Sequence, residues 1–369
     1  MAVLTGSMSA LAVALGSPAA QAGTANRGLP GAGSDPIAHM AWGNPGGYDQ
    51  LGSAYLSAEG WKRAMLGRLA LQPRALWLGW SWHVSQIRAE AAGAVLQAQN
   101  GHRNVLTQFA TFELNPWERK AANGVDRPVA QAHWNVSSDE AWYRNLAAGI
   151  GNARALVILQ VDLPVALGIR STGFERIDTY GARGLSARPY TTVYIDGGTH
   201  GWLTAAQDAT LLIRNGIRYA RGFALDDTDY DPTAIEDEFG AQVVAELAKR
   251  GVHGKHFIVN TDENGQPYRP YQVPGRGIND APVCHGAVQM ACQRIGIPPT
   301  TDVASPQWDL GPTAAADARR FCDGYVWSGQ PWDVDGGPFE LSWALELAEN
   351  GEYLPGTPGA LPPDGWDAL

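Results

Sequence analysis

The sequence predicts an α/β protein in which about seven parallel strands form one distorted, incomplete β/α barrel. Short apolar runs of strand length alternate with longer helical segments, and continuous apolar runs are typical of parallel strands covered by helices on both faces. The 369 residues, 45% of them hydrophobic, suit one barrel-sized domain, and no change in composition marks a second one. Because the first strand is followed by neither a G-x-G-x-x-G fingerprint nor a P-loop, an open doubly wound sheet is only the alternative fold.

The elements follow from the apolar pattern. We expect strands in RALWLGW (74–80), NVLTQFATFEL (104–114), ALVILQVD (155–162), TTVYID (191–196), RGFALDD (221–227), HFIVNTD (256–262) and GYVW (324–327). We expect helices in 56–70, 83–101, 139–154, 203–216, 232–251, 315–322 and 339–351. The second of these helices should stop at Asn100 and Gly101, a typical C-terminal signal. The long Pro- and Gly-rich segment 265–280 reads as a loop.

The two ends of the chain are expected to lie outside the barrel. Residues 1–22 contain a weakly apolar stretch, 11–15, and end in Ala20-Gln21-Ala22, which resembles a signal-peptide cleavage site. The first basic residue is Arg27, so the usual positive segment is missing, and a disordered Ala- and Gly-rich tail is the alternative. We predict a secreted protein with a signal peptide at 1–22, a flexible leader at 23–38, the barrel domain at 39–355 and a Pro-rich tail at 356–369.

Composition excludes several classes of partner. The formal net charge is −10, the isoelectric point is near 5.3 and no Lys/Arg block stands out, which argues against nucleic acid and anionic membranes. Beyond the N-terminal segment, no apolar run approaches the length that spans a bilayer. We expect a monomer that needs no cofactor.

The cysteines leave their pairing open. Cys284, Cys292 and Cys322 show no CxxC or Cys/His spacing, so no metal site is predicted. One disulfide with one free thiol, or three buried thiols, both fit the sequence. The 14 Trp residues outnumber Tyr and Phe, and Trp suits stacking on sugars or bases as well as filling a core.

The chemistry should come from carboxylates at the ends of strands. In parallel sheets and barrels the carboxyl ends of strands meet at one rim, and the loops there carry the functional groups. An isolated Asp after a strand commonly caps the next helix. Recurrence after five strands weakens that reading, with the carboxylates Asp162, Asp196, Asp226, Asp227, Asp262, Asp333 and Asp335 in these positions.

Two of these carboxylates fit an acid and a base. An acid with a raised pKa, separated from a base by the width of a water, is the machinery of inverting glycoside hydrolysis. Asp162 ends the apolar run VILQV, where burial and neighbouring carboxylates should raise its pKa, so it suits the acid. Asp335 lies on a Gly-rich loop open to solvent, which suits the base.

An ordered set of segments resembles glycoside hydrolase family 6, the inverting cellulases. The resemblance runs from about Trp42 to about Gly351 and rests on LWLG, ALVILQVDLPVAL, VYIDGGTHGWL, RGFALDDTDY, GKHFIVNTDENGQP, RIGIPPT and YVWSGQPWDVDGG. It implies a distorted, incomplete β/α barrel whose cleft crosses the carboxyl ends of the strands and binds β-1,4-glucans for hydrolysis.

The resemblance also implies roles for catalytic residues. Asp162 matches the family's proton donor, and Asp196 matches its supporting aspartate. Asp335 matches the aspartate proposed as base. Glu118 stands where the family has a second aspartate that assists the donor through a shared proton network.

The implied substrate-binding residues include several departures from the family. Trp77 and Trp202 match tryptophans that stack on sugars, whereas Phe112 replaces a tyrosine. The remaining polar departures are Thr199 for histidine, Asp226 and Asp229 for asparagines, Gly329 for lysine and Asp333 for glutamate. We therefore expect retained hydrolysis with altered or broadened glycan specificity.

The mode of attack and two other functions stay open. Only Gly336, Gly337 and Pro338 separate Asp335 from the next predicted helix, where exo-acting members of the family have a long enclosing loop, so we expect an open cleft and endo attack. The alternatives are a glycosidase of the same fold acting on another polysaccharide and a catalytically silent glycan-binding protein.

Overall fold

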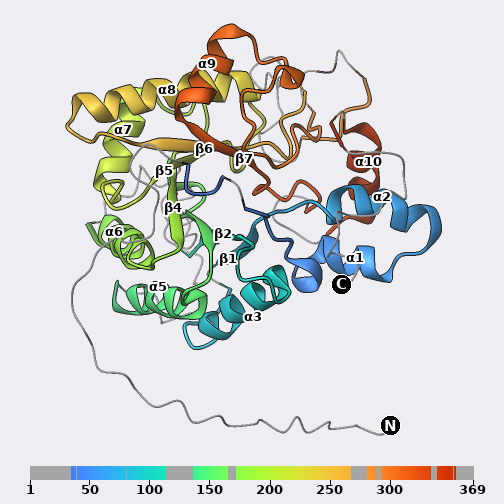
Figure 1. The fold of residues 1–369 in the computed structure, drawn as a ribbon, viewed down its shortest axis with the longest axis horizontal. Helices are drawn as coiled ribbons and strands as arrows, with labels where there is room; N and C mark the ends of the chain where they lie inside the picture. The colour runs from blue at the N-terminus through green and yellow to red at the C-terminus, as the bar shows by residue number, and fades with distance from the viewer. Residues whose placement is uncertain are drawn as a thin grey trace, which may run out of the picture.

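Seven parallel strands form one sheet in the order in which they occur along the chain (Figure 1). The computed structural model describes residues 35–38, 40–79, 81–113, 136–164, 172–266, 281–286, 289, 292–333, 339–351 and 353–354. The strands are β1 (Leu76–Gly79), β2 (Thr107–Phe112), β3 (Ala155–Leu159), β4 (Thr191–Asp196), β5 (Gly222–Leu225), β6 (His256–Asn260) and β7 (Cys322–Val326). The predicted fold class, an incomplete parallel β/α barrel, is confirmed.

Helices surround the curled sheet. They are α1 (Gln50–Ser57), α2 (Gly60–Ala70), α3 (Ile87–Gln99), α5 (Val136–Ile150), α6 (Thr172–Ser186), α7 (Ala205–Arg214), α8 (Thr233–Lys249), α9 (Pro312–Phe321) and α10 (Leu341–Asn350), with short 3₁₀ turns at η1 (Gly46–Tyr48) and η4 (Pro306–Trp308). Figure 1 shows α3, α5, α6, α7, α8 and α9 around the strands, and α1, α2 and α10 gathered on one side. None of the described helices is both long and apolar enough to cross a membrane.

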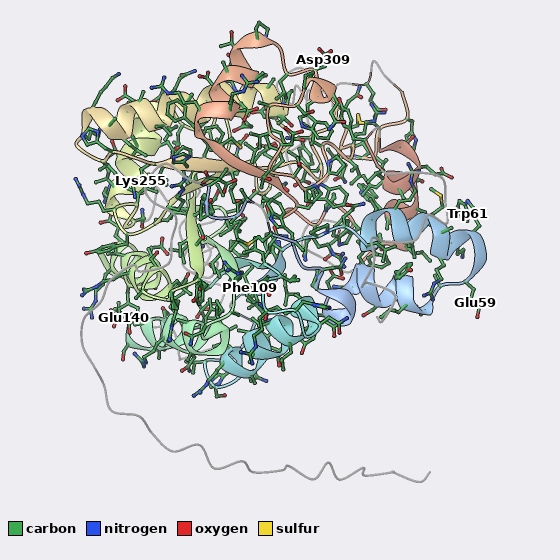
Figure 2. The ribbon with its side chains drawn as sticks, viewed as in Figure 1. Glu59, Trp61, Phe109, Glu140, Lys255 and Asp309 are labelled. Atoms are coloured by element: carbon green, nitrogen blue, oxygen red, sulfur yellow. A yellow bond between two sulfur atoms is a disulfide. The ribbon has the colours of Figure 1, made fainter. Side chains whose placement is uncertain are left out.

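Alternate strand residues divide the core into two parts, because successive side chains of a strand point to opposite faces. Phe109 and its equivalents pack outward against the helices, whereas Ala110 faces the inside of the curl. That inside is filled by Ile158, Tyr194 and their equivalents on the other strands, together with Trp42 from the N-terminal segment. Figure 2 shows Phe109 within the fold and Trp61, which is 55% exposed, at its outer edge.

The sheet does not close by regular pairing of its first and last strands. Among the described residues, β1 and β7 are not neighbours in the sheet order. The two edges still approach each other, since the Ala75 N–H donates to the Trp327 carbonyl at 2.8 Å and the Trp77 indole N–H donates to the Ser328 carbonyl. The open side therefore lies next to Trp77.

Three details differ from the predicted elements or settle what they left open. Helix α6, between β3 and β4, was not among the predicted helices. The predicted helix 56–70 is part of two helices, because Ala58 and Glu59 are extended and Gly60 has φ 53°. Cys284 and Cys292 form a disulfide, and Cys322 is a buried free thiol.

Candidate active site

Asp162 lies on a sharply turned segment that follows β3. Its φ is 63°, and that of Gln160 is 56°, a left-handed conformation uncommon outside glycine and often found at functional sites. The Thr228 hydroxyl, after β5, donates to the Asp162 Oδ1 at 2.6 Å. Burial raises the pKa of Asp162, and the hydrogen bond from Thr228 opposes this shift. The side chain is only half-buried, so a protonated carboxyl there remains in reach of a ligand.

Asp196 holds the turn that carries Asp162. Its Oδ2 accepts the backbone N–H of Leu163 at 3.1 Å, and its Oδ1 accepts that of Gly198 at 2.9 Å. Helix α7, next along the chain, is capped by Thr204 instead. The alternative that a strand-end aspartate caps the following helix is therefore wrong for Asp196.

A glycine is required two residues after Asp196, at Gly198. Gly198 has φ 73°, and a Cβ there would lie 2.6 Å from the Pro164 side chain. Both the left-handed backbone and the close approach of Pro164 exclude a larger residue. The Gly-Gly break after the strand therefore serves the packing of the two rim loops.

The segment after β5 adds four more carboxyl groups, those of Asp226, Asp227, Asp229 and Asp231. Asp227 accepts a hydrogen bond from the Ser328 hydroxyl, and burial raises its pKa to about 7. Asp229 accepts from the Tyr230 N–H at 2.9 Å and from Trp202. Burial raises the pKa of Asp229 to about 7 as well. Asp162, Asp196 and Asp227 thus meet at the ends of three neighbouring strands.

Asp226 lies deeper than these residues. The Thr199 hydroxyl lies 3.1 Å from Asp226 Oδ1, 3.3 Å from Asp231 Oδ2 and 2.9 Å from Glu236 Oε1. One hydroxyl supplies one hydrogen, so it can donate to only one of the three carboxyl groups at a time. Burial raises the pKa of all three. The structure places Asp226 fully buried behind the rim, and its role in substrate binding stays a prediction.

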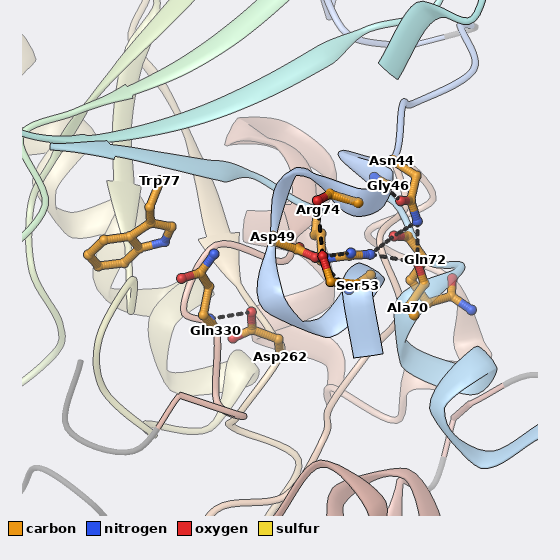
Figure 3. A network of polar contacts seen from close by, with 12 residues as sticks. Asn44, Gly46, Asp49, Ser53, Ala70, Gln72, Arg74, Trp77, Asp262 and Gln330 are labelled. Atoms are coloured by element: carbon orange, nitrogen blue, oxygen red, sulfur yellow. Dashed lines mark hydrogen bonds and ion pairs between the residues drawn. The ribbon is translucent and has the colours of Figure 1, made fainter. Parts of the chain in front are cut away.

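The loop after β7 is fixed to the end of β6. Asp262 Oδ2 accepts the backbone N–H groups of Gly329 at 2.9 Å and Gln330 at 3.2 Å (Figure 3). A Cβ at Gly329 would lie 2.2 Å from Glu263 Oε1 and 2.7 Å from Asp262 Oδ1. A side chain at the position where the resemblance implies a lysine would therefore have to displace the carboxyl ends of Glu263 and Asp262.

Aromatic side chains flank this group of carboxyls on both sides. Trp77 on β1 contacts Phe112 on β2 edge to face, with ring centroids 5.7 Å apart, and both rings are half-buried. Trp202, after β4, is half-buried and bonded to Asp229. Partly exposed indole faces beside carboxyl groups suit a sugar chain.

The remaining predicted residues divide into two groups. Asp333 is described, and burial and the nearby Asp49 raise its pKa to about 7, against the effect of Arg74. Glu118 and Asp335 lie outside the described residues, so their placement and roles stay predictions.

Several residues of the site were not singled out from the sequence. Thr228, Glu263 and Ser328 directly follow strands or strand-end aspartates, and that proximity was the only available signal. Within the described ranges, no group of three or more His, Cys, Asp or Glu side chains is arranged to hold a metal ion.

The chain is similar in sequence to two curated endoglucanases. No family model matches the chain. It is 26% identical over 306 residues to endoglucanase A of Cellulomonas fimi, covering 81% of this chain and 59% of that protein. It is 32% identical over 216 residues to endoglucanase 1 of Streptomyces halstedii, covering 56% of this chain and 63% of that protein. The chain thus spans about three fifths of these curated relatives.

Solved structures agree on the fold. The endoglucanase Cel6 of Mycobacterium tuberculosis, in complex with a thio-linked cello-oligosaccharide, has a TM-score of 0.66 at 21% identity, covering 86% of this chain and 99% of that one. A GH6 enzyme of Orpinomyces sp. Y102 has a TM-score of 0.62 at 18% identity, covering 86% and 99%. The predicted resemblance to glycoside hydrolase family 6 is confirmed, and the chain has that fold in a divergent sequence.

Proposed function

We propose that the chain is an inverting, endo-acting hydrolase of β-1,4-glucosidic bonds in cellulose or related β-glucans. The observation that carries the proposal is Asp162: a half-buried carboxyl with a raised pKa, on a strained turn, held in place by Asp196 and Thr228. A general acid needs this combination of a retained proton and access to the glycosidic oxygen. The similar proteins named as endoglucanases support the same substrate class.

Four carboxyl groups have proposed roles in the reaction. Asp162 protonates the leaving oxygen, and Asp196 holds the backbone beside it through the Leu163 N–H. Asp335 acts as the base that activates water on the other face of the sugar, as the resemblance implies. Glu118 assists the donor. Trp77 and Trp202 stack on the sugars to either side of the bond.

Endo attack is the finer part of the proposal. It rests on the three residues between Asp335 and the segment that leads into α10, and on the endoglucanase names of both curated relatives. A viscosity assay on a soluble cellulose derivative separates the two modes. Endo attack lowers viscosity early for few reducing ends released, whereas exo attack releases many ends at nearly constant viscosity.

A panel of soluble polysaccharides tests the proposed reaction. Reducing ends should be released from β-1,4-glucans by the wild type and not by Asp162→Asn. Release by both proteins would point to a contaminant or a different acid. A ligand-dependent rise in melting temperature without release from any glycan would favour a silent binding protein, since binding to the native state alone raises stability.

A second candidate is a glycosidase of the same fold that acts on another polysaccharide. The observation in its favour is Gly329, where Glu263 and Asp262 fill the space of the family's lysine and replace a cation with two carboxyl groups. Sugar contacts on that side of the cleft must therefore differ. Release from another glycan in the panel, with β-1,4-glucans untouched, would establish this candidate instead.

A further inference from the structure

Gln330 lies on a strained turn of the loop after β7. Its φ is 63°, a conformation that glycine adopts freely and most other residues adopt at a cost in free energy. Both backbone polar groups of the residue are hydrogen-bonded within the fold. The N–H donates to Asp262 Oδ2 at 3.2 Å, and the carbonyl accepts the Asp333 N–H at 3.0 Å. These two bonds hold the backbone in its left-handed conformation.

The side chain of Gln330 is the part of the residue that the fold does not bond. Among the described residues, its hydrogen bonds involve the backbone alone, and the residue is only half-buried. A side-chain amide offers an acceptor oxygen and an NH₂ donor group. Both groups are therefore available to a ligand.

The amide of Gln330 lies beside the Trp77 indole. Trp77 Nε1 donates to the carbonyl of Ser328, which precedes Gln330 by two residues. Figure 3 shows the Gln330 side chain extending away from Asp262 and toward the indole ring. The same indole is held by its edge-to-face contact with Phe112. A fixed, half-buried aromatic ring and an unbonded amide thus lie next to each other at the rim of the sheet.

The residue before Gln330 supplies no polar side chain. The resemblance implies a lysine at Gly329, where a side chain would have to displace the carboxyl ends of Glu263 and Asp262. Gln330 instead places a neutral amide on the same turn. An uncharged group that both donates and accepts hydrogen bonds suits the hydroxyl groups of a neutral sugar.

We propose that Gln330 is a substrate-binding residue whose amide bonds hydroxyl groups of the sugar that stacks on Trp77. The inference rests on the proposed function, because it takes Trp77 as a platform for a sugar. Stacking holds a sugar by its face and leaves it free to shift within the plane of its ring. Hydrogen bonds from the amide to the edge of the ring fix that position and discriminate between sugars that differ in those hydroxyl groups.

Gln330→Gly tests the proposal without disturbing the turn. Glycine adopts a φ of this sign without strain, so the variant should fold at least as well as the wild type. KM on a soluble β-1,4-glucan should rise about three- to tenfold, because hydrogen bonds that hold the substrate throughout the reaction are lost. The value of kcat should stay within about twofold, as expected for a loss of uniform binding. Gln330→Met keeps the length of the side chain without the amide and should raise KM to the same extent.

The matched control is Asn100→Gly. Asn100 also carries an amide on a left-handed residue, with φ 39°, but it is exposed at the end of α3. That end of α3 leads into the amino end of β2, opposite the rim. KM of this variant should equal that of the wild type.

A double substitution tests whether Trp77 and Gln330 hold the same sugar. Trp77→Ala removes the platform, so the sugar is no longer presented to the amide. Adding Gln330→Gly to this variant should therefore raise KM by a smaller factor than it does in the wild type. Effects of the two substitutions that multiply would overturn the proposal, because they would place the two residues on different sugars.

Calorimetric binding of cellotetraose to Asp162→Asn gives a readout that needs no turnover. Adding Gln330→Gly should weaken the affinity about three- to tenfold. An unchanged KM in either Gln330 variant, or an unchanged affinity in this experiment, would overturn the proposal. Binding of cellotetraose that depends on Gln330, in a wild type that hydrolyses no β-1,4-glucan, would reject the proposed function and leave the contact standing.

Discussion

The position and the protonation of one carboxyl group, that of Asp162, determine whether the proposed reaction can occur. Asp162 is aligned by its left-handed backbone, by the Leu163 N–H bound to Asp196 and by the Thr228 hydroxyl. Burial raises its pKa, and the side chain is only partly exposed. These contacts come from three different strands, so the acid depends on the curl of the sheet.

Asp162→Asn separates protonation from binding. The rate on glucosides with poor leaving groups should fall about a hundred- to ten-thousandfold, because their oxygen must be protonated as the bond breaks. Activated aryl glucosides should lose far less, since their leaving groups depart without a proton. Rates on both kinds of substrate are measured by initial velocities, and equal losses on both would reject Asp162 as the donor.

A buried ion pair fixes α1 and α2 to the end of the barrel. The Arg74 guanidinium bonds both oxygens of Asp49, the N-cap of α1, and donates to the Ala70 carbonyl of α2 at 2.6 Å (Figure 3). The Trp332 ring lies 5.9 Å from the guanidinium carbon. This arrangement ties the loop after β7, which carries Asp333, to the first two helices.

Arg74→Met should lower the free energy of unfolding by about 3 to 5 kcal/mol, because it leaves the Asp49 carboxylate buried without its partner. Urea titration followed by circular dichroism measures the change. The matched control, Arg63→Met, removes an exposed cation over the Tyr55 ring and should cost about 0.5 kcal/mol or less. Equal losses of unfolding free energy in the two variants would show that the buried ion pair contributes no more to stability than the exposed contact.

The elements also show what the sequence could predict. All seven strands were predicted because a continuous apolar run bounded by turn residues has few other interpretations. Helix α6 was missed, although parallel β3 and β4 need a crossover, because its segment TGFERIDTYGARGLS carries three glycines and many polar residues. The break between α1 and α2 depends on Gly60, whose left-handed φ is not visible in a helical pattern.

The site was predicted only in outline, for a related reason. Strand-end position correctly brought Asp162, Asp196 and Asp227 to one rim. It could not show that Asp226 is fully buried against Thr199, because that contact joins loops 27 residues apart. The same limit applies to Gly329, whose Cβ position is taken by the carboxyl groups of Glu263 and Asp262 from the segment after β6.

Buried carboxyl groups with raised pKa values dominate the electrostatics of the molecule. Burial raises the pKa of Glu113 from 4.5 to about 9, and those of Asp227, Asp229, Asp262 and Asp333 from 3.8 to about 7. At a pH between a group's pKa in the unfolded chain and its higher pKa in the fold, the unfolded chain has released a proton that the folded chain keeps. Their contribution to stability is therefore complete at acid pH and is lost as pH rises through the folded-state pKa values.

The free energy of unfolding should accordingly fall between about pH 5 and about pH 8. Glu113→Gln should make this decline shallower, by about 1 kcal/mol per pH unit, because the buried amide has no proton to lose. Urea unfolding at a series of pH values measures both slopes. Stability that rises with pH across this range, or an unchanged slope in Glu113→Gln, would contradict the view that the buried carboxyl groups are protonated in the fold.

The anomer of the newly formed reducing end tests whether hydrolysis proceeds with inversion. Proton NMR of a β-1,4-glucan digest, recorded before the product mutarotates, distinguishes the two anomers. We expect the α-anomer, since water attacks from the face opposite the bond that Asp162 protonates. The β-anomer as first product would contradict the inverting mechanism and the assignment of a separate base.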